Sequence, residues 1–244
     1  MEPRREDICV IIPTYNNAGT VMDVIARTLA LDLPVIVVND GCTDATALLL
    51  ADADLPLTVL SHERNRGKGI ALRTGLAFAR KAGYRYAVTL DADGQHYPED
   101  LPLLLAAIDA HPGALVLGSR NLASENMPGG NTFANRFSNF WFHVQTGLRI
   151  PDTQTGYRAY PLGKLPSLRL LTARYEAELT LLVFSAWKGI ELVPVPVRVC
   201  YPEDRVSSFR PFRDFFRISV LNTFLCLLAL VYGYPRMLLA RLKR

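Results

Sequence analysis

The sequence predicts an α/β protein whose core is a doubly wound sheet of parallel strands. Short apolar runs rich in Val and Ile recur through the first 120 residues, as expected of strands that are covered on both faces. Helical stretches separate these runs, and such alternation is typical of this fold class. Polar clusters follow the apolar runs, at the carboxyl ends of the expected strands, where sheets of this kind bind ligands.

The first half of the chain contains the expected strands and helices in regular order. The strands cover residues 8–13, 34–40, 57–61, 86–91 and 114–119, and the helices cover roughly 20–31, 44–53, 68–82 and 99–110. Thr20 and Asp44 are candidate N-cap residues, because their side-chain oxygens can accept hydrogen bonds from free backbone N–H groups. Pro98, followed by two acidic residues, predicts the first turn of the last helix.

The pattern is less regular after residue 120. Residues 127–147 predict a loop that leads into an aromatic-rich helix, and residues 150–161 predict a polar loop between two prolines. Residues 174–189 predict a further helix. Residues 191–202 contain several prolines, which favour an edge strand because proline cannot donate a backbone hydrogen bond within a sheet.

The composition indicates one globular domain with an appendage. The chain has 244 residues, of which 50% are hydrophobic, enough for one sizeable core. The four cysteines are scattered, without a CxxC pair or a nearby His at ligand spacing, so we expect no disulfide framework, no zinc site and a reducing compartment. No long apolar stretch precedes the first expected strand, so we expect no signal peptide.

The net charge of +4 is unevenly distributed along the chain. From Arg205 to the end, eight Lys and Arg residues stand against Asp214 alone, which gives +7 and leaves −3 for the first 204 residues. A basic tail on a mildly acidic body argues against a nucleic-acid partner, because the basic surface of such proteins usually lies on the folded domain. It suits a tail that contacts an anionic surface.

Residues 218–234 form an almost wholly apolar stretch with Arg217 before it and Arg236 after it. The stretch is slightly shorter than the roughly 20 residues of a membrane span, and its flanking arginines suit anionic lipid headgroups. We expect a main domain at residues 1–210 and a membrane-associated helical tail at 211–244. A buried core helix and a true single span remain alternatives.

Asp91, Asp93 and Gln95 follow the expected strand at 86–91. A turn that begins at Ala92 can bring the two carboxylates together, and with the carboxamide oxygen they form a hard-oxygen site for Mg²⁺ or Mn²⁺. Water and a substrate diphosphate would complete the coordination. The alternative is a solvated turn with capping carboxylates, because two aspartates at this spacing often occur by chance.

Two other polar positions suit a nucleoside. Asp40 ends the second expected strand, where a carboxylate can accept a hydrogen bond from a ribose hydroxyl or a base N–H. Tyr15 can stack on a base, although a tyrosine at the rim of the core is an equal alternative. The stretch NRGKGIALRTG at 65–75 resembles a glycine-rich phosphate loop, but the GK[ST] ending is absent, so we reject a P-loop.

Six motifs of the chain, in the order in which they occur, resemble those of the family 2 glycosyltransferases. They are VIIPTYNN, VVNDGCTD, NRGKGIALRTG, LDADGQHYPEDL, GSR and DTQTGYRAY, within about residues 8–210. Within this family the chain is similar to the dolichyl- and polyprenyl-phosphate sugar synthases. The resemblance implies an A-type glycosyltransferase fold, which is the Rossmann-like fold of nucleotide-diphospho-sugar transferases. It also implies an inverting, metal-dependent transferase at the cytoplasmic face of a membrane.

The resemblance also implies roles for individual residues. Donor binding is expected of Pro13, Tyr15, Val38, Asp40, Asp91, Ala92, Asp93 and Arg205, and metal binding of Asp91, Asp93 and Gln95. Arg120 and Arg136 would contact the phosphates of donor or acceptor. Two departures, Asn16-Asn17 after the tyrosine and Asn39 in place of an aspartate, remove negative charge near the nucleoside and leave the base identity open. The QxxRW signature of processive synthases is absent, which favours a single transfer.

The acceptor decides whether the reaction needs a base. A lipid phosphate is already anionic and could attack without one, provided that arginines hold it. Arg120, Arg136, Arg158, Arg205 and Arg210 are available for this. A hydroxyl acceptor, as in polysaccharide or glycolipid synthesis, would need a carboxylate to take its proton. Asp152 is then the best candidate, followed by Glu176 and Glu178, for which an exposed helix face is the favoured interpretation.

Two functions of other classes remain open at this point. A nucleotidyltransferase also uses carboxylates, a metal and a nucleotide fold, but it would release pyrophosphate. A catalytically inert membrane-bound binding protein would have no use for Asp91, Asp93 and Gln95 together. The sequence does not identify the sugar, the nucleotide, the lipid or the oligomeric state.

Overall fold

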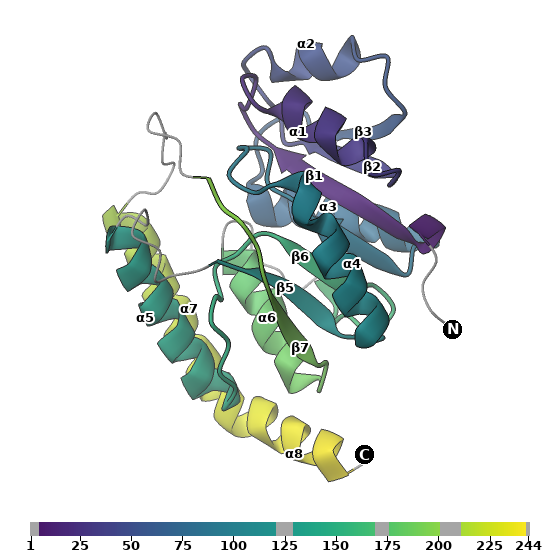
Figure 1. Cartoon of the computed structure of the whole chain (residues 1–244). Coiled ribbons are helices and arrows are strands. Elements are labelled where there is room, and N and C mark those ends of the chain that lie inside the picture. The colour runs from purple at the N-terminus through teal and green to yellow at the C-terminus, as the bar shows by residue number, and fades with distance from the viewer. Residues whose placement is uncertain (1–4, 121–128, 169–175, 201–210, 243–244) are drawn as a thin grey trace.

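The computed structural model describes residues 5–120, 129–168, 176–200 and 211–242, and within them a seven-stranded sheet lies between two layers of helices (Figure 1). The strand order is β3-β2-β1-β4-β6-β5-β7. The strands are β1 (Ile8–Thr14), β2 (Val35–Asn39), β3 (Leu57–Ser61), β4 (Tyr86–Thr89), β5 (Leu115–Ser119), β6 (Arg158–Pro161) and β7 (Leu192–Pro196).

The helices follow the expected order and lie close to the expected ranges. They are α1 (Val21–Leu29), α2 (Thr46–Ala51), α3 (Lys68–Lys81), α4 (Leu101–Ala110), α5 (Gly129–Thr146), α6 (Glu176–Trp187), α7 (Pro211–Leu228) and α8 (Tyr234–Leu242). Short 3₁₀ turns cover Arg5–Asp7 and Pro98–Asp100, and a π-helical turn, Ala229–Gly233, joins α7 to α8. Pro98 therefore opens the turn that leads into α4, as the sequence predicts.

The sheet is mixed rather than wholly parallel, because one strand runs against its neighbours. Strands β1, β2, β3 and β4 pair in parallel, but β6 pairs antiparallel with both β4 and β5. The expectation of a polar loop at 150–161 is therefore wrong for its last four residues. The pattern hid the strand because β6 is short and its first residue, Arg158, is a fully buried cation.

The edge position of the proline-rich segment is confirmed. Strand β7 pairs in parallel with β5 and with no other strand of the described sheet, and Pro194 and Pro196 lie in this edge strand.

The two expected N-caps need correction. Thr20 occupies the N-cap position of α1 but makes no capping bond; its hydroxyl instead donates to the Ala92 carbonyl oxygen at 2.6 Å. Asp44 lies one residue before the N-cap position of α2, which Ala45 occupies, although its carboxylate accepts from the Thr46 backbone N–H.

Each face of the sheet carries its own apolar core. On one face, α1 and α4 bury Val24, Ile25, Leu104 and Ile108 against β1, β2 and β4. On the other, α3, α5 and α6 cover the sheet, with Phe142 and Trp187 fully buried. Because both faces are covered, the strands are almost wholly apolar, as the sequence pattern requires.

The C-terminal helices pack against the second of these cores. α7 lies beside α5, and α8 continues from it beyond the end of α5 (Figure 1). Leu225 and Ala229 belong to the core, and a Cβ at Gly233 would lie 2.4 Å from the Trp187 ring. Asn222 is buried and accepts a hydrogen bond from the Gln145 side chain. One side of this helical segment is thus part of the folded domain.

Candidate functional site

Asp91 and Asp93 lie just beyond the carboxyl end of β4, at the edge of the sheet to which the sequence assigns the site. The loop before β6 reaches the same edge, since the Thr89 hydroxyl donates to the Gly156 carbonyl oxygen at 2.6 Å. A Cβ at Gly156 would lie 2.5 Å from Asp91 Oδ2, so only glycine lets this loop approach the carboxylate. The motifs at 89–95 and 152–160 therefore meet in space.

Lys68, the first residue of α3, joins Asp91 to a second carboxylate. Its Nζ lies 2.8 Å from Asp91 Oδ1 and 3.2 Å from Glu178 Oε2, in α6. Burial alone would lower the pKa of Lys68, but the charges of Asp91 and Glu178 outweigh burial and hold its pKa above the ordinary value. Burial would raise the pKa of Asp91, but Lys68 holds it below the ordinary value. The pKa of Glu178 is raised by burial.

The expectation that the two glutamates of α6 lie on an exposed face is wrong. Glu178 is 8% exposed and points to Lys68, and Glu176 is half-buried. Helix α6 is covered because it packs against α3, α5 and α8, so that even its polar positions face other parts of the protein.

The turn after Asp91 has the conformation that the sequence suggests. Asp93 Oδ1 accepts a hydrogen bond from the Gln95 backbone N–H at 3.0 Å, and Gly94 has a φ of 72°. Asp91, Asp93 and Gln95 are all partly exposed, whereas Ala92 between them is buried. The turn is therefore only partly accessible to solvent.

The chemistry of these side chains fits a magnesium or manganese ion. Two carboxylates and a carboxamide are hard oxygen ligands, and Mg²⁺ is usually held by one or two carboxylates together with substrate phosphates. Among the described residues, no group of three or more His, Cys, Asp or Glu side chains forms a cluster that could hold a metal. A donor diphosphate would thus have to supply much of the coordination.

The residues expected to bind the nucleoside lie at the carboxyl ends of β1 and β2. Tyr15 is 43% exposed and open to stacking, and Pro13 lies in β1. The Val38 side chain is fully buried in the core, so only its backbone could touch a ligand. Their roles in donor binding stay predictions.

Asp40 is 2% exposed and fully engaged within the protein. Its carboxylate lies 2.6 Å from His62 Nδ1 and accepts from the backbone N–H groups of Arg66 and Gly67. Asp40 therefore ties the loop before α3 to the end of β2. This loop leads directly to Lys68, so Asp40 also fixes where that side chain begins.

Three asparagines stabilise the loops that follow β1 and β2. Asn16 has a φ of 56° and exchanges hydrogen bonds with Thr43, while the Asn39 side chain accepts from the Cys42 backbone N–H. Asn17 donates to the Thr14 hydroxyl and to the Tyr15 carbonyl oxygen. These amide side chains hold the loops by hydrogen bonds without adding negative charge.

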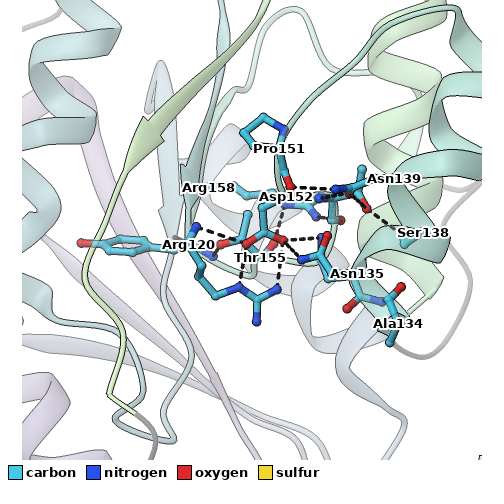
Figure 2. A network of polar contacts seen from close by, with 12 residues as sticks. Arg120, Ala134, Asn135, Ser138, Asn139, Pro151, Asp152, Thr155 and Arg158 are labelled. Atoms are coloured by element: carbon cyan, nitrogen blue, oxygen red, sulfur yellow. Dashed lines mark hydrogen bonds and ion pairs between the residues drawn. The ribbon is translucent and has the colours of Figure 1, made fainter. Parts of the chain in front are cut away.

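Arg120 and Asp152 form a pair with several hydrogen bonds at this edge (Figure 2). The guanidinium donates from Nε to Asp152 Oδ2 at 2.6 Å and from Nη2 to Oδ1 at 2.9 Å, and Asn135 of α5 donates to Oδ1 at 2.6 Å. Asp152 is 1% exposed. Burial would raise its pKa, but the hydrogen bond and charge of Arg120 outweigh it and hold the pKa of Asp152 below the ordinary value.

The other arginines differ in what they can contact. Arg136 in α5 is exposed, next to the buried Asn135. Arg158 is fully buried and donates to the carbonyl oxygens of Thr153, Thr155 and Glu178; Figure 2 shows Arg158 beside Thr155. The expectation that Arg158 serves a phosphate is wrong, because its guanidinium holds the polypeptide backbone together. Arg205 and Arg210 lie outside the described residues.

Three site residues were not singled out from the sequence. Lys68 lay in a motif rejected as a P-loop, and Asn135 carried no signal of its own. His96 follows Gln95, is 6% exposed and packs against the Tyr157 ring at a centroid distance of 5.3 Å. Burial lowers the pKa of His96 to about 4, so the ring is neutral at pH 7. Its place directly after the aspartate turn was the available clue.

Comparison with known proteins now decides the family. The family model described as glycosyl transferase family 2 matches residues 9–160. The chain belongs to glycosyltransferase family 2. It is an enzyme of the hexosyltransferase type, and it is similar to the dolichyl- and polyprenyl-phosphate sugar transferases.

Named relatives match along most of their length. The UDP-N-acetylglucosamine–dolichyl-phosphate N-acetylglucosaminyltransferase of Methanococcus voltae is 28% identical over 88% of this chain and 96% of its own. The polyprenol monophosphomannose synthase of Mycolicibacterium smegmatis is 32% identical over 82% of this chain and 79% of its own. The undecaprenyl-phosphate mannosyltransferase of Micrococcus luteus is 30% identical over 78% of this chain and 82% of its own.

Solved structures support the A-type glycosyltransferase fold. The glucosyl-3-phosphoglycerate synthase of Mycobacterium tuberculosis, solved with Mn²⁺, UDP-glucose and phosphoglyceric acid, has a TM-score of 0.60 at 19% identity, over 91% of this chain and 79% of its own. The mannosyl-3-phosphoglycerate synthase of Rubrobacter xylanophilus has a TM-score of 0.62 at 20% identity, over 97% of this chain and 75% of its own.

Proposed function

We propose that this enzyme transfers one sugar from a nucleotide-sugar donor, of the GDP-mannose or UDP-glucose type, to a polyprenyl or dolichyl phosphate. The reaction inverts the anomeric centre, uses Mg²⁺ or Mn²⁺, and takes place at the cytoplasmic face of a membrane. The names of three relatives support the acceptor class, because they refer to dolichyl phosphate, polyprenol monophosphomannose and undecaprenyl phosphate.

The state of Asp152 is the observation that carries this proposal. A hydroxyl acceptor needs a carboxylate that can take its proton. Asp152 is the best candidate from the sequence, yet both of its oxygens accept hydrogen bonds from Arg120 and its pKa is lowered, so it is a weak base. A phosphate acceptor is already anionic and needs no base. The pair is therefore better suited to hold Arg120 in place for a phosphate.

Asp91, Asp93 and Gln95 would hold the metal ion. When bound, the ion would neutralise the charge that develops on the diphosphate leaving group. The carboxyl ends of β1 and β2, with Tyr15, would receive the nucleoside beside it, and Asp40 would act there by holding the loop before α3 in place. These assignments are carried over from the family motifs, and the common position at one sheet edge supports them.

The chemical step needs only positioning by the protein. An oxygen of the lipid phosphate attacks the anomeric carbon from the face opposite the diphosphate, and the bond from that carbon to the diphosphate oxygen breaks. The products are a glycosylated lipid phosphate, in which the configuration of the anomeric carbon is inverted, and a nucleoside diphosphate. Arg120 and Arg136 would hold the acceptor phosphate in line, which is how a bound geometry accelerates such a reaction.

The apolar surface of α5, α7 and α8 suits the lipid and the membrane. In the described part of the chain, one continuous helical stretch, Ile218–Leu239, is long and apolar enough to cross a membrane by length and composition, with a mean hydropathy of 1.6. Its exposed apolar side chains include Phe224, Leu227, Leu230, Val231 and Leu238. Since the other side packs on the domain, we propose that the tail lies in the membrane surface. The division at residue 210 stays a prediction.

A product assay tests this function. The purified enzyme in detergent is given polyprenyl phosphate, Mn²⁺ and each of several nucleotide-sugars, and the lipid and nucleotide products are identified by mass spectrometry. We expect one donor to give a singly glycosylated lipid phosphate and a nucleoside diphosphate in equal amounts. Release of pyrophosphate would indicate a nucleotidyltransferase, and absence of turnover with every donor would favour a binding protein.

A further inference from the structure

Lys68 is a half-buried cation held between two carboxylates that come from different elements. Its side chain is 20% exposed, that of Asp91 24% and that of Glu178 10%. The ammonium contacts both oxygens of Asp91, at 2.8 and 2.9 Å, and one oxygen of Glu178 at 3.2 Å. The single positive charge of Lys68 thus lies between two negatively charged carboxylates, and its contacts with Asp91 are the shorter ones.

This arrangement conflicts with a metal ion at Asp91 unless Lys68 can leave it. A divalent cation on Asp91 would use the same oxygens that Lys68 now contacts. The two cations would also repel each other strongly at such short range, because the site is shielded from water. The ammonium therefore needs another partner when the metal binds, and Glu178 is already within its reach.

We propose that Lys68 is an exchangeable cation that neutralises Asp91 while the metal is away and moves onto Glu178 when the metal binds. Lys68 and Glu178 are positioning residues that set the affinity of the metal site without contacting the metal. This inference rests on the proposed metal site at Asp91 and Asp93.

The geometry allows this exchange without movement of the backbone. Lysine carries its charge on a flexible four-carbon stem with rotatable donors, and rotation within that stem suffices because Nζ already contacts both partners. The backbone of Glu178 is held in place, since its carbonyl oxygen accepts from Arg158 Nη1 at 2.7 Å. Gly156 leaves space beside the ammonium, where a Cβ would lie 3.0 Å from Nζ.

Mn²⁺ binding to the full-length enzyme tests the exchange, measured by electron paramagnetic resonance or calorimetry without nucleotide. Lys68→Met removes the competing cation, so we expect Mn²⁺ to bind roughly tenfold more tightly. Glu178→Gln removes the second partner and leaves Lys68 on Asp91, so we expect Mn²⁺ to bind roughly tenfold more weakly. In the Lys68→Met background, Glu178→Gln should change the affinity little, because there is no lysine left to hold.

Two further variants make the outcomes distinguishable. Lys81→Met, at the exposed end of the same helix, should bind Mn²⁺ like the wild type. Asp93→Asn should lose Mn²⁺ binding; if it does not, the proposed metal site is wrong. If Asp93→Asn loses binding but Lys68→Met does not tighten it, the exchange alone is overturned. An equal effect of Glu178→Gln with and without Lys68 would mean that Glu178 acts directly on the metal, which also overturns the exchange.

Discussion

At the scale of single residues, Asp93 carries the sharpest claim about the metal. We expect Asp93→Ala to lower the transfer rate by roughly a hundredfold or more, because the diphosphate charge would lose its stabilising partner. Excess chelator should abolish the activity of the wild-type enzyme, and added Mn²⁺ should restore it. Initial rates with donor and lipid phosphate measure both effects. Near-normal turnover of the variant, or full activity in chelator, contradicts the metal role.

Arg136 provides a test of the acceptor side. Arg136→Ala should weaken the use of polyprenyl phosphate by about one to two decades, the size of a lost charge-assisted contact. Arg136→Lys should weaken it less, since it keeps the charge and loses the planar fork. Acceptor-dependent turnover is measured beside nucleoside diphosphate affinity, which should not change in either variant. A loss of nucleotide affinity instead would assign Arg136 to the donor.

The single-residue level also shows what the sequence can and cannot predict. Asp91, Asp93 and Gln95 could be predicted as a site because a short motif directly follows a recognisable strand. The partners of Asp91 could not be found in this way, because Lys68 and Glu178 are distant in sequence and meet only through the packing of α3 and α6 on the sheet. Charged residues of such helices usually face solvent, so the pattern predicted an exposed Glu178.

At the scale of elements, the strands β1 to β5 could be predicted and β6 could not. Apolar runs of Val and Ile identify strands that are covered on both faces. β6 has four residues and begins with an arginine, so its pattern is that of a loop. The burial of Arg158 depends on three carbonyl acceptors that only the folded chain brings together.

Arg158 should therefore matter for stability. We expect Arg158→Met to lower the free energy of unfolding by about 3 kcal/mol or more, because three buried carbonyl groups lose their donor. Urea unfolding followed by circular dichroism measures the change. The exposed Arg149→Met is the matched control and should stay within about 0.5 kcal/mol of the wild type. Equal stability of the two variants would mean that the Arg158 bonds contribute little.

At the scale of the whole molecule, the tail connects the site to a lipid phase. Helix α5 carries Asn135 and Arg136 near the Asp152 pair and, further along, the exposed Phe140. α7 lies beside it and adds a larger apolar surface (Figure 1). The sequence predicted an apolar, basic tail, but not that one side of it completes the core, because that contact depends on Trp187 and Gln145.

The exposed side of the tail can be tested without disturbing the core. Leu227 and Val231 are 63% and 76% exposed, one helical turn apart. The double change Leu227→Glu and Val231→Glu should lower partition onto anionic liposomes by about tenfold or more, because apolar contact with lipid is lost. Sedimentation measures partition, and nucleotide binding should remain. Val59→Glu, on the edge strand β3, is the control. Unchanged sedimentation of the double variant would show that this surface is not the membrane contact.

The central claim is that the acceptor is a lipid phosphate that attacks without a catalytic base. The most direct test compares two acceptors with the same polyprenyl chain, one with a phosphate and one with a free hydroxyl, at saturating donor and Mn²⁺. We expect transfer to the phosphate with stoichiometric release of a nucleoside diphosphate, and no detectable transfer to the alcohol. Equal transfer to the alcohol would contradict it and would return Asp152 to the role of a base.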